Sequence, residues 1–302
     1  MLSVKADNLT KIYKNKYKVT PILLAEEFSI DPGTLVFLTG KSGAGKSTLL
    51  RLILREELPD YGKIFFNNLE ITSLKDSQLS LIRSKIGVIF QHYRLINYKT
   101  VAENISFVLD INKVPRKEQD EIIERLLKLV DLIDKKDYLP QQLSGGEQRR
   151  VTIARALATN PTIILADEPT GDLDPNNTEI IIDIFNQLLK QNISIILATH
   201  QLDLASDFSS PKLWYLERGH IYKNISLPEL KSRYFTDTTE IPKDTLLFLQ
   251  ELPEPIKKKL EVIMPVHLHS LAKLTPKILQ KQLGLTQKEI QTMIETLTSY
   301  LN

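Results

Sequence analysis

The sequence predicts an α/β protein with a mainly parallel sheet, a helical insertion and a small helical extension at the C-terminus. Three observations support this prediction. A glycine-rich loop separates an apolar strand-like segment from a helix-like segment within residues 35–58, two short apolar segments at 162–167 and 193–198 flank a segment of helical periodicity, and prolines divide residues 225–302 into helical pieces. Short, wholly apolar segments are typical of strands buried on both faces of a parallel sheet.

The individual elements follow in order along the chain. Strands are expected in "PILLAEEFSI", "LVFLTG", "GKIFFNN", "KIGVIFQ", "TIILA" and "ISIILA". Helices are expected in "STLLRLILREEL", which has no breaker before Pro59, across most of residues 100–130, and in "NTEIIIDIFNQLLKQ". We therefore expect one domain at residues 1–224 and a small helical extension at residues 225–302.

The last helix of the extension has the clearest pattern. Thr286 and Glu289 have the spacing of a capping box. One helix face collects the apolar residues Ile290, Met293, Ile294, Leu297 and Leu301. This pattern predicts a small helical appendage.

Composition narrows the function classes. The chain has 302 residues, of which 42% are apolar and 25% charged, as in an average soluble protein. Its net charge of +2 gives no electrostatic sign of a nucleic-acid partner, and the absence of cysteine excludes disulfides, thiolate nucleophiles and cysteine-ligated metals. The N-terminus lacks the apolar core of a secretory signal, and the apolar runs are too short to span a bilayer, so a soluble or peripheral protein is expected.

The glycine-rich loop "GKSGAGKS", residues 40–47, fits the pattern G-x-x-x-x-G-K-[ST] directly between a strand and a helix. Glycines allow the backbone to wrap closely around phosphate oxygens, so that its N–H groups converge on them. Lys46 would neutralise the β- and γ-phosphates, and the Ser47 hydroxyl would bind Mg²⁺. The alternative, a flexible Gly/Ser loop, fits this strand–loop–helix context poorly.

Polar residues follow three other predicted strands. Asp167 and Glu168 end "TIILADE", where ligands bind in open parallel sheets, and His200 and Gln91 follow two further strands. Asp167 is placed to hold Mg²⁺ through water, and Glu168 to polarise the water that attacks the γ-phosphate. Taken alone, the acids could occupy a solvated turn, and His200 and Gln91 could be structural. The neighbouring phosphate loop favours the functional interpretation of the acids.

The segment "LSGGEQ", residues 143–148, begins a helix with a serine and two glycines. Ser144 could be an ordinary N-cap followed by a tight turn. Alternatively, the glycines could open the helix N-terminus to an anion, since backbone N–H groups and the helix dipole favour a phosphate there. The residues alone leave both interpretations open.

These motifs, in this order, resemble the nucleotide-binding domain of ABC ATPases over about residues 2–223. The resemblance implies ATP and Mg²⁺ as cofactors and an ABC-type P-loop fold with an N-terminal antiparallel β subdomain and a helical signature subdomain. It assigns Tyr13 to adenine stacking, and the phosphate loop to Gly40, Ser42, Gly43, Ala44, Gly45, Lys46, Ser47 and Thr48. It also implies catalytic roles for Lys46, Gln91, Glu168 and His200, metal contacts from Ser47, Gln91 and Asp167, a D-loop at Asp174, and contacts to a second subunit's ATP from Ser144, Gly145, Gly146 and Gln148.

Within this family, "FLTGKSGAGKSTLLRLI", "IFQHYRLINYKTVAENI" and "LADEPTGDLD" resemble the FtsE group. That resemblance implies an ATPase at the cytoplasmic face of the inner membrane that dimerises on ATP, drives an FtsX-like integral membrane subunit and controls cell-wall hydrolysis during division. A lipoprotein-releasing or MacB-type transporter ATPase is the alternative. The same ATP-driven motion of the membrane subunit would then move a substrate.

Two further questions stay open at this stage. A soluble ABC protein acting on nucleic acid or ribosomes would usually carry paired nucleotide-binding domains, a long coiled coil or cysteine-ligated zinc, so no nucleic-acid partner is expected. The extension at 225–302 is expected to pack on its own ATPase domain or to support a dimer rather than to bind a distinct partner. Its Lys257, Lys258 and Lys259 are interspersed with acids and are expected to form a solvated face.

Overall fold

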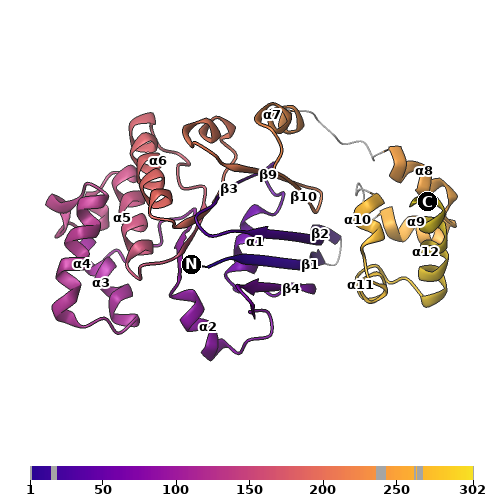
Figure 1. The fold of residues 1–302 in the computed structure, drawn as a ribbon, viewed down its shortest axis with the longest axis horizontal. Helices are drawn as coiled ribbons and strands as arrows, with labels where there is room; N and C mark the ends of the chain where they lie inside the picture. The colour runs from indigo at the N-terminus through magenta and orange to yellow at the C-terminus, as the bar shows by residue number, and fades with distance from the viewer. Residues whose placement is uncertain (1, 15–18, 236–242, 262, 264–267, 302) are drawn as a thin grey trace. The chain divides into compact units, whose positions relative to one another are not determined.

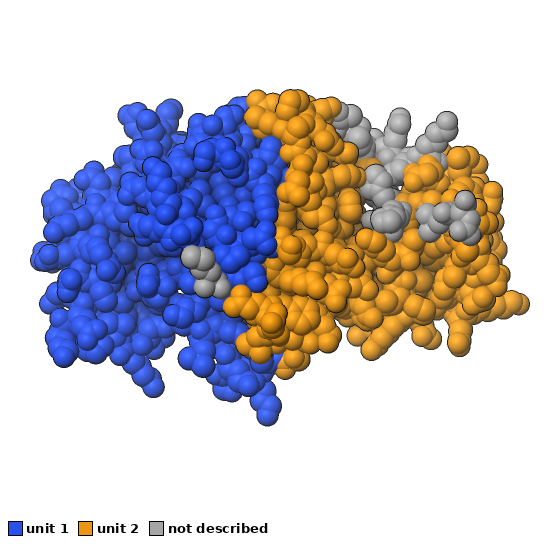
Figure 2. Space-filling view, viewed as in Figure 1, with its two compact units in different colours: residues 1–3, 30–39, 74–213 blue, residues 4–29, 40–73, 214–302 orange. Residues whose placement is uncertain are grey.

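The computed structural model describes residues 2–14, 19–235, 243–261, 263 and 268–301 (Figure 1). These residues form two compact units, each discontinuous in sequence (Figure 2). The first unit contains residues 1–3, 30–39 and 74–213, and the second contains residues 4–29, 40–73 and 214–302.

The first unit is built on four parallel strands in the order β3-β8-β7-β6. Their bounds are Leu35–Thr39 for β3, Ser194–Ala198 for β8, Ile163–Asp167 for β7 and Ile86–Ile89 for β6. All residues of β3 and β8 are buried, as their mostly apolar sequences predict for strands covered on both faces. The carboxyl ends of β7 and β8 lie side by side because Asp167 pairs with Ala198.

Helices complete the first unit (Figure 1). They are α2 (Asp76–Arg83), α3 (Val101–Ile111), α4 (Arg116–Leu129), α5 (Gly145–Leu157) and α6 (Pro175–Lys190), joined by short 3₁₀ turns at Ile133–Lys135, Pro140–Gln142 and Leu202–Asp207. Helices α3, α4 and α5 pack on one another and form the expected helical insertion. The helices predicted within 100–130 and 177–191 are confirmed.

The second unit begins with an antiparallel sheet in the order β2-β1-β4-β5. The strands are β1 (Val4–Lys14), β2 (Val19–Ile30), β4 (Tyr61–Phe66) and β5 (Leu69–Glu70). The pairing of β1 with β4 changes register between Asp7 and Thr10, and a Cβ on Gly62 would lie 2.2 Å from the Asn8 carbonyl oxygen. Glycine is therefore required at this bulge.

Helix α1 (Lys46–Ile53) and the hairpin of β9 (Lys212–Glu217) with β10 (His220–Lys223) follow; of β9, the residues from Trp214 onward belong to this unit. Helix α1 is shorter than predicted, since the sequence has no breaker before Pro59. It ends at Ile53 because Arg55 takes a left-handed backbone with φ 58°, and the N–H groups of Glu56 and Glu57 turn back to the Arg51 carbonyl.

The C-terminal extension consists of short helices: α7 (Leu227–Phe235), α8 (Lys243–Glu251), α9 (Glu254–Glu261), α10 (Leu268–Ala272), α11 (Pro276–Leu283) and α12 (Gln287–Leu301). Its apolar core is continuous with the antiparallel sheet, because Ile12 of β1 and Leu24 of β2 are buried in the same cluster. The domain boundary at residue 224 remains a prediction.

The predicted features of α12 are mostly present. Thr286 Oγ1 accepts from the Glu289 N–H, and the Glu289 carboxylate accepts from the Thr286 N–H, which confirms the capping box. Ile290, Met293 and Leu297 are buried, whereas Ile294 is 40% exposed. Ile294 lies at the edge of the apolar stripe, where the core is not wide enough to cover it. The side chain of Leu301 lies outside the described residues.

Candidate functional site

The glycine-rich loop lies in the second unit, and its backbone permits only glycine at two places. Gly40 has φ 157°, and a Cβ there would lie 2.4 Å from the Leu216 carbonyl oxygen. Gly45 has φ 109°, and a Cβ there would lie 2.4 Å from Cγ2 of Ile22. The loop therefore wraps too tightly for any side chain at these positions, as the phosphate-loop prediction requires.

The end of this loop begins α1 without a cap. The N-cap residue of α1 is Gly45, which has no side chain with which to cap the first turn. Lys46 is 9% exposed, and its Nζ donates to the Gly40 carbonyl oxygen at 2.8 Å, so the ammonium lies over the loop. Ser42 is exposed and Thr48 is buried. An uncapped helix start with an ammonium beside it is suited to an anion of several charges, such as a triphosphate.

Tyr13 lies on β1 in the same unit and is 39% exposed. Its hydroxyl donates to Glu57 Oε2 at 2.5 Å and lies 3.5 Å from Oγ1 of Thr48, in the first turn of α1. The predicted aromatic residue is thus beside the phosphate loop. Partial burial and the Glu57 hydrogen bond together raise the pKa of Tyr13.

The acidic pair lies in the first unit, at the end of β7. Glu168 has a left-handed backbone with φ 48°, and its N–H donates to the Ala198 carbonyl oxygen of β8 at 2.8 Å. This conformation is uncommon for a residue with a side chain, and such strain concentrates at functional sites. It turns the Glu168 side chain away from the line of the strand that ends at Asp167.

Glu168 and His200 are brought together. Glu168 Oε1 lies 2.9 Å from His200 Nδ1, and the His200 backbone N–H donates to Glu168 Oε2 at 3.4 Å. The Glu168 side chain is 12% exposed, whereas that of His200 is 56% exposed. A carboxylate held by an adjacent imidazole at the end of two parallel strands is a suitable general base for a water molecule, with the imidazole presented to solvent or ligand.

The "LSGGEQ" segment begins α5, also in the first unit. Ser144 Oγ accepts from the Glu147 N–H at 3.3 Å, and Glu147 Oε2 accepts from the Ser144 N–H at 2.9 Å, so the segment is a capping box. The Glu147 carboxylate also pairs with Lys135, and this hydrogen bond lowers the pKa of Glu147. A Cβ on Gly146 would lie 2.2 Å from Cγ of Asn177 on α6. The ordinary N-cap interpretation therefore holds within the chain, without excluding a role for the exposed Ser144 and Gly145.

Gln91 and Gln148 line one cavity of about 470 Å³ in the first unit, together with Arg149 and residues of the 92–97 and 171–172 loops. The Gln91 residue is exposed, and the Gln148 amide donates back to the Leu143 carbonyl oxygen at 3.2 Å.

Sequence reasoning missed Arg149, which holds the loop after β6 in place. Its guanidinium donates to the Phe90 and Gln91 carbonyl oxygens at 2.6 and 2.9 Å and lies over the Tyr93 ring. Burial lowers the pKa of Arg149. An arginine placed among buried residues of α5 is the only sequence signal that could have identified it.

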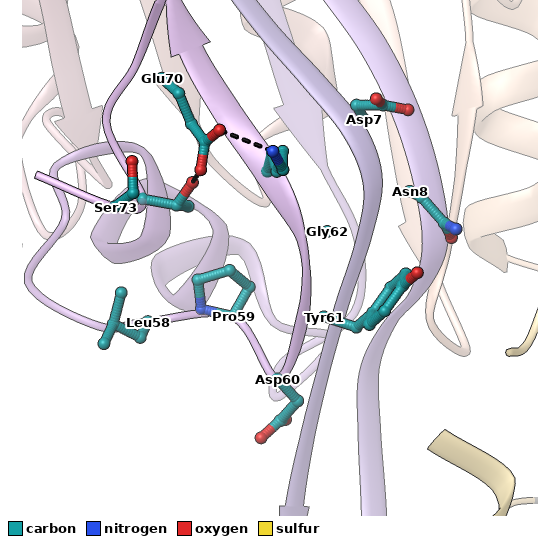
Figure 3. A pocket seen from close by; sticks show the side chains of 11 residues that line it. Asp7, Asn8, Leu58, Pro59, Asp60, Tyr61, Gly62, Glu70 and Ser73 are labelled. Carbon is teal, nitrogen blue, oxygen red and sulfur yellow. Dashed lines mark hydrogen bonds and ion pairs between the residues drawn. The ribbon is translucent and has the colours of Figure 1, made fainter. Parts of the chain in front are cut away.

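The antiparallel sheet has a separate hollow of about 490 Å³, lined by Asp7, Asn8, Leu58, Pro59, Asp60, Tyr61, Gly62, Lys63, Glu70, Thr72 and Ser73 (Figure 3). It contains none of the predicted site residues. Two of its charged side chains, Lys63 and Glu70, form an ion pair at 2.7 Å.

The residues present fit a nucleoside triphosphate with Mg²⁺. In the second unit, the glycine cradle and Lys46 suit the phosphates, and the Ser47 hydroxyl suits Mg²⁺. In the first unit, the Asp167 carboxylate and the Gln91 amide are oxygen donors of the kind that Mg²⁺ prefers. The described residues include no group of three or more His, Cys, Asp or Glu side chains that could hold a metal without other ligands. A Mg²⁺ ion bound by the Ser47 hydroxyl would depend on phosphate oxygens for part of its coordination.

Comparison with known proteins agrees with this chemistry. Residues 25–171 match the family described as ABC transporter. A methionine import ATP-binding protein, MetN 2, from Acinetobacter baylyi is 36% identical over 302 residues, which cover 99% of this chain and 85% of that protein. MetN 2 of Bacillus cereus is 36% identical over 259 residues, which cover 85% of this chain and 76% of that protein.

A solved structure is similar as well. The ATP-binding cassette MJ0796, in a dimeric post-hydrolysis state with ADP and Pi, has a TM-score of 0.67 and 34% identity, covering 74% of this chain and 99% of its own. The chain belongs to the ATP-binding proteins of ABC transporters. It has the ABC ATPase fold and is an ATP hydrolase that uses ATP with Mg²⁺.

The expectation of an FtsE-like division ATPase is wrong, and so is its alternative, a lipoprotein-releasing or MacB-type ATPase. The relatives that align with most of this chain are named as methionine import proteins. The stretches that suggested FtsE include the phosphate loop, the loop after β6 and the acidic pair, which serve nucleotide chemistry. Such motifs carry little information about the membrane partner.

None of the helices that the structure describes combines the length and the apolar composition needed to cross a membrane.

Proposed function

We propose that this protein is the ATPase subunit of an ABC importer for methionine. The observation that supports this proposal is the alignment with the Acinetobacter baylyi methionine import protein, because it extends over 99% of the chain and includes the helical extension. A similarity confined to the phosphate loop and the acidic pair would support ATP hydrolysis alone.

The predicted residues have the following proposed roles. Tyr13 stacks on adenine, and Gly40, Ser42, Gly43, Ala44, Gly45, Lys46, Ser47 and Thr48 enclose the phosphates. Ser47, Asp167 and Gln91 hold Mg²⁺, which, when bound, neutralises charge on the β- and γ-phosphates. Glu168 takes the proton of the attacking water, and His200 orients Glu168 and contacts the γ-phosphate.

The signature residues Ser144, Gly145, Gly146 and Gln148 are proposed to contact the ATP bound by the phosphate loop of a second copy. ATP would then join two copies, and hydrolysis would separate them. Because no described helix spans a membrane, we propose that the protein acts from the cytoplasmic face of the inner membrane through an integral membrane permease subunit.

The test is uptake of radiolabelled methionine by cells in which the chromosomal gene is deleted or carries Glu168→Gln. The amide cannot accept the proton of water, so hydrolysis should fall by a factor on the order of 10³ while ATP binding persists. We expect both strains to lose high-affinity methionine uptake and to retain leucine uptake. Unchanged methionine uptake in the deletion strain would rule out the proposed substrate.

A further inference from the structure

The hydroxyl of Tyr13 is held by a residue that no motif includes. Tyr13 lies on β1, and Glu57 lies 44 positions later, in the turn that follows α1. The hydroxyl donates to Glu57 Oε2 at 2.5 Å, and the ring remains 39% exposed. A half-exposed aromatic ring normally has rotational freedom about χ1 and χ2, and a hydrogen bond at its far end restricts both.

Glu57 is itself held in place, so that it can act as an anchor. The N–H groups of Glu56 and Glu57 donate to the Arg51 carbonyl oxygen at 2.9 and 3.3 Å, which fixes the turn against the end of α1. Arg51 Nη1 also lies 3.3 Å from Glu57 Oε1, and Lys11 Nζ lies 3.7 Å from Glu57 Oε2. The carboxylate is 24% exposed, and despite the opposing effect of partial burial, its hydrogen bonds to Tyr13 and Arg51 lower its pKa.

The same ring is oriented from two further directions. Lys11 Nζ lies 5.3 Å from the centroid of the Tyr13 ring, and it donates to the Leu58 carbonyl oxygen at 2.9 Å. The Tyr13 hydroxyl also lies 3.5 Å from Oγ1 of Thr48. The Tyr13 hydroxyl thus contacts Thr48 in the first turn of α1 and Glu57 in the turn that follows the helix.

We propose that Glu57 is a positioning residue for the base of the nucleotide: by holding the Tyr13 hydroxyl, it sets the ring orientation on which adenine stacks. This inference rests on the proposed role of Tyr13. It predicts that Glu57 contributes to the binding of the base and not to the binding of phosphate, since the Lys46 ammonium and the loop glycines act on the phosphates.

The experiment measures dissociation constants of the full-length protein for ATP and for inorganic tripolyphosphate, which has no base. Glu57→Ala and Tyr13→Phe should each weaken ATP binding about fivefold, because each releases the ring from its preferred rotamer. The double variant should be no weaker than either single variant, since one hydrogen bond is lost in all three. Glu57→Gln retains an acceptor oxygen and should restore affinity, and tripolyphosphate should bind every variant as it binds the wild type.

Glu70→Ala is the matched control. Glu70 belongs to the same unit, is 25% exposed and forms an ion pair with Lys63, but it lies in the hollow of Figure 3 and does not contact Tyr13. We expect it to bind ATP as the wild type does. If Glu57→Ala weakened the binding of tripolyphosphate as much as the binding of ATP, the proposal would be overturned, because Glu57 would then act by supporting α1.

Tyr13→Ala separates this inference from the proposal on which it rests. If Tyr13→Ala weakens ATP binding strongly while Glu57→Ala and Tyr13→Phe do not, Glu57 is not a positioning residue but Tyr13 still contacts the base. If Tyr13→Ala leaves ATP binding unchanged, both the role of Tyr13 and that of Glu57 are wrong, and the assignment of the phosphate loop is unaffected.

Discussion

Glycine lies at the N-terminus of both α1, as its N-cap Gly45, and α5, as Gly145 and Gly146, but the two N-termini are completed in different ways. Helix α5 is capped by its own side chains, through the reciprocal hydrogen bonds of Ser144 and Glu147. Helix α1 has Gly45 as its N-cap, and this residue supplies no side-chain cap. The difference suits the N-terminus of α1 to an anionic ligand, whereas α5 has its own side-chain cap and can offer Ser144 and Gly145 to a partner.

Glycine is also required for different reasons near the starts of α1 and α5. Gly40 and Gly45 have positive φ, so their backbone conformation excludes side chains. Gly146 is excluded from having a side chain by Asn177 of the neighbouring helix, and Gly145 has only the Tyr93 hydroxyl near the position of a Cβ, at 3.1 Å. Gly40 and Gly45 of the phosphate loop are therefore required by both backbone conformation and close contacts, and Gly146 of the signature by packing alone.

The largest effect is expected at α1. Lys46→Ala removes the ammonium beside the uncapped helix start, so ATP affinity should fall by about 100-fold or more, as for loss of a charge-assisted contact to phosphate. Isothermal titration with ATP measures this change. Lys63→Ala in the same unit removes a lysine whose ion pair lies in a separate hollow, and it should bind ATP normally (Figure 3).

The next effect concerns packing at α5. Gly146→Ala places a methyl group within 2.6 Å of three side-chain atoms of Asn177, so the free energy of unfolding should fall by about 1–3 kcal/mol. Urea denaturation measures the change. Adding Asn177→Ala removes the three clashing atoms and should recover most of the loss, while Gly145→Ala should cost little. An equal loss in Gly145→Ala would contradict the packing explanation.

A smaller effect is expected from the cap itself. Ser144→Ala removes the oxygen that accepts from the Glu147 N–H and should destabilise the protein by about 1 kcal/mol. Ser144→Asp retains an acceptor and should be close to the wild type in urea denaturation. If both variants were equally unstable, the side-chain cap would not be what completes α5.

The smallest effect concerns the acid sensitivity that the Glu147 carboxylate of α5 gives to the protein. The Lys135 hydrogen bond holds the pKa of Glu147 below its ordinary value of 4.5. A lowered folded pKa contributes stability that is present above 4.5 and is lost as the pH falls from there through the folded pKa. Lys135→Ala should therefore lower the melting temperature at pH 7 and make its decline below pH 4.5 less steep; an unchanged decline would exclude the pair as its cause.

Much of the fold follows from periodicity and turn chemistry. The apolar segments at 163–167 and 194–198 became the buried strands that the sequence predicts, and the P-loop pattern lies between β3 and α1 as expected. The residue at which α1 ends could not be predicted from the sequence, because the left-handed conformation of Arg55 depends on the turn that closes on Arg51. Propensity alone contains no signal for such a tertiary contact.

The site could be predicted only as a set of motifs. The contact between Glu168 and His200 follows from the neighbouring strand ends of β7 and β8, which parallel pairing implies. The contacts of Glu57 with Tyr13 and of Arg149 with the loop after β6 join residues far apart in sequence and belong to no motif. The similarity to methionine import proteins was not predicted, because the nucleotide motifs do not encode a transported substrate.

The comparison of α1 with α5 is tested most directly by mixing two inactive proteins. Lys46→Ala disables the phosphate loop, and Gly145→Asp places a carboxylate where the signature would meet the γ-phosphate, in a first-turn position that an acid does not destabilise. Each variant alone should hydrolyse no ATP. If α5 of one copy serves the nucleotide held at α1 of the other, an equal mixture should recover roughly a quarter of wild-type hydrolysis, since half of the dimers contain one intact site. An inactive mixture, with mixed dimers verified by differential tags, would contradict the assignment of the two helices to different copies.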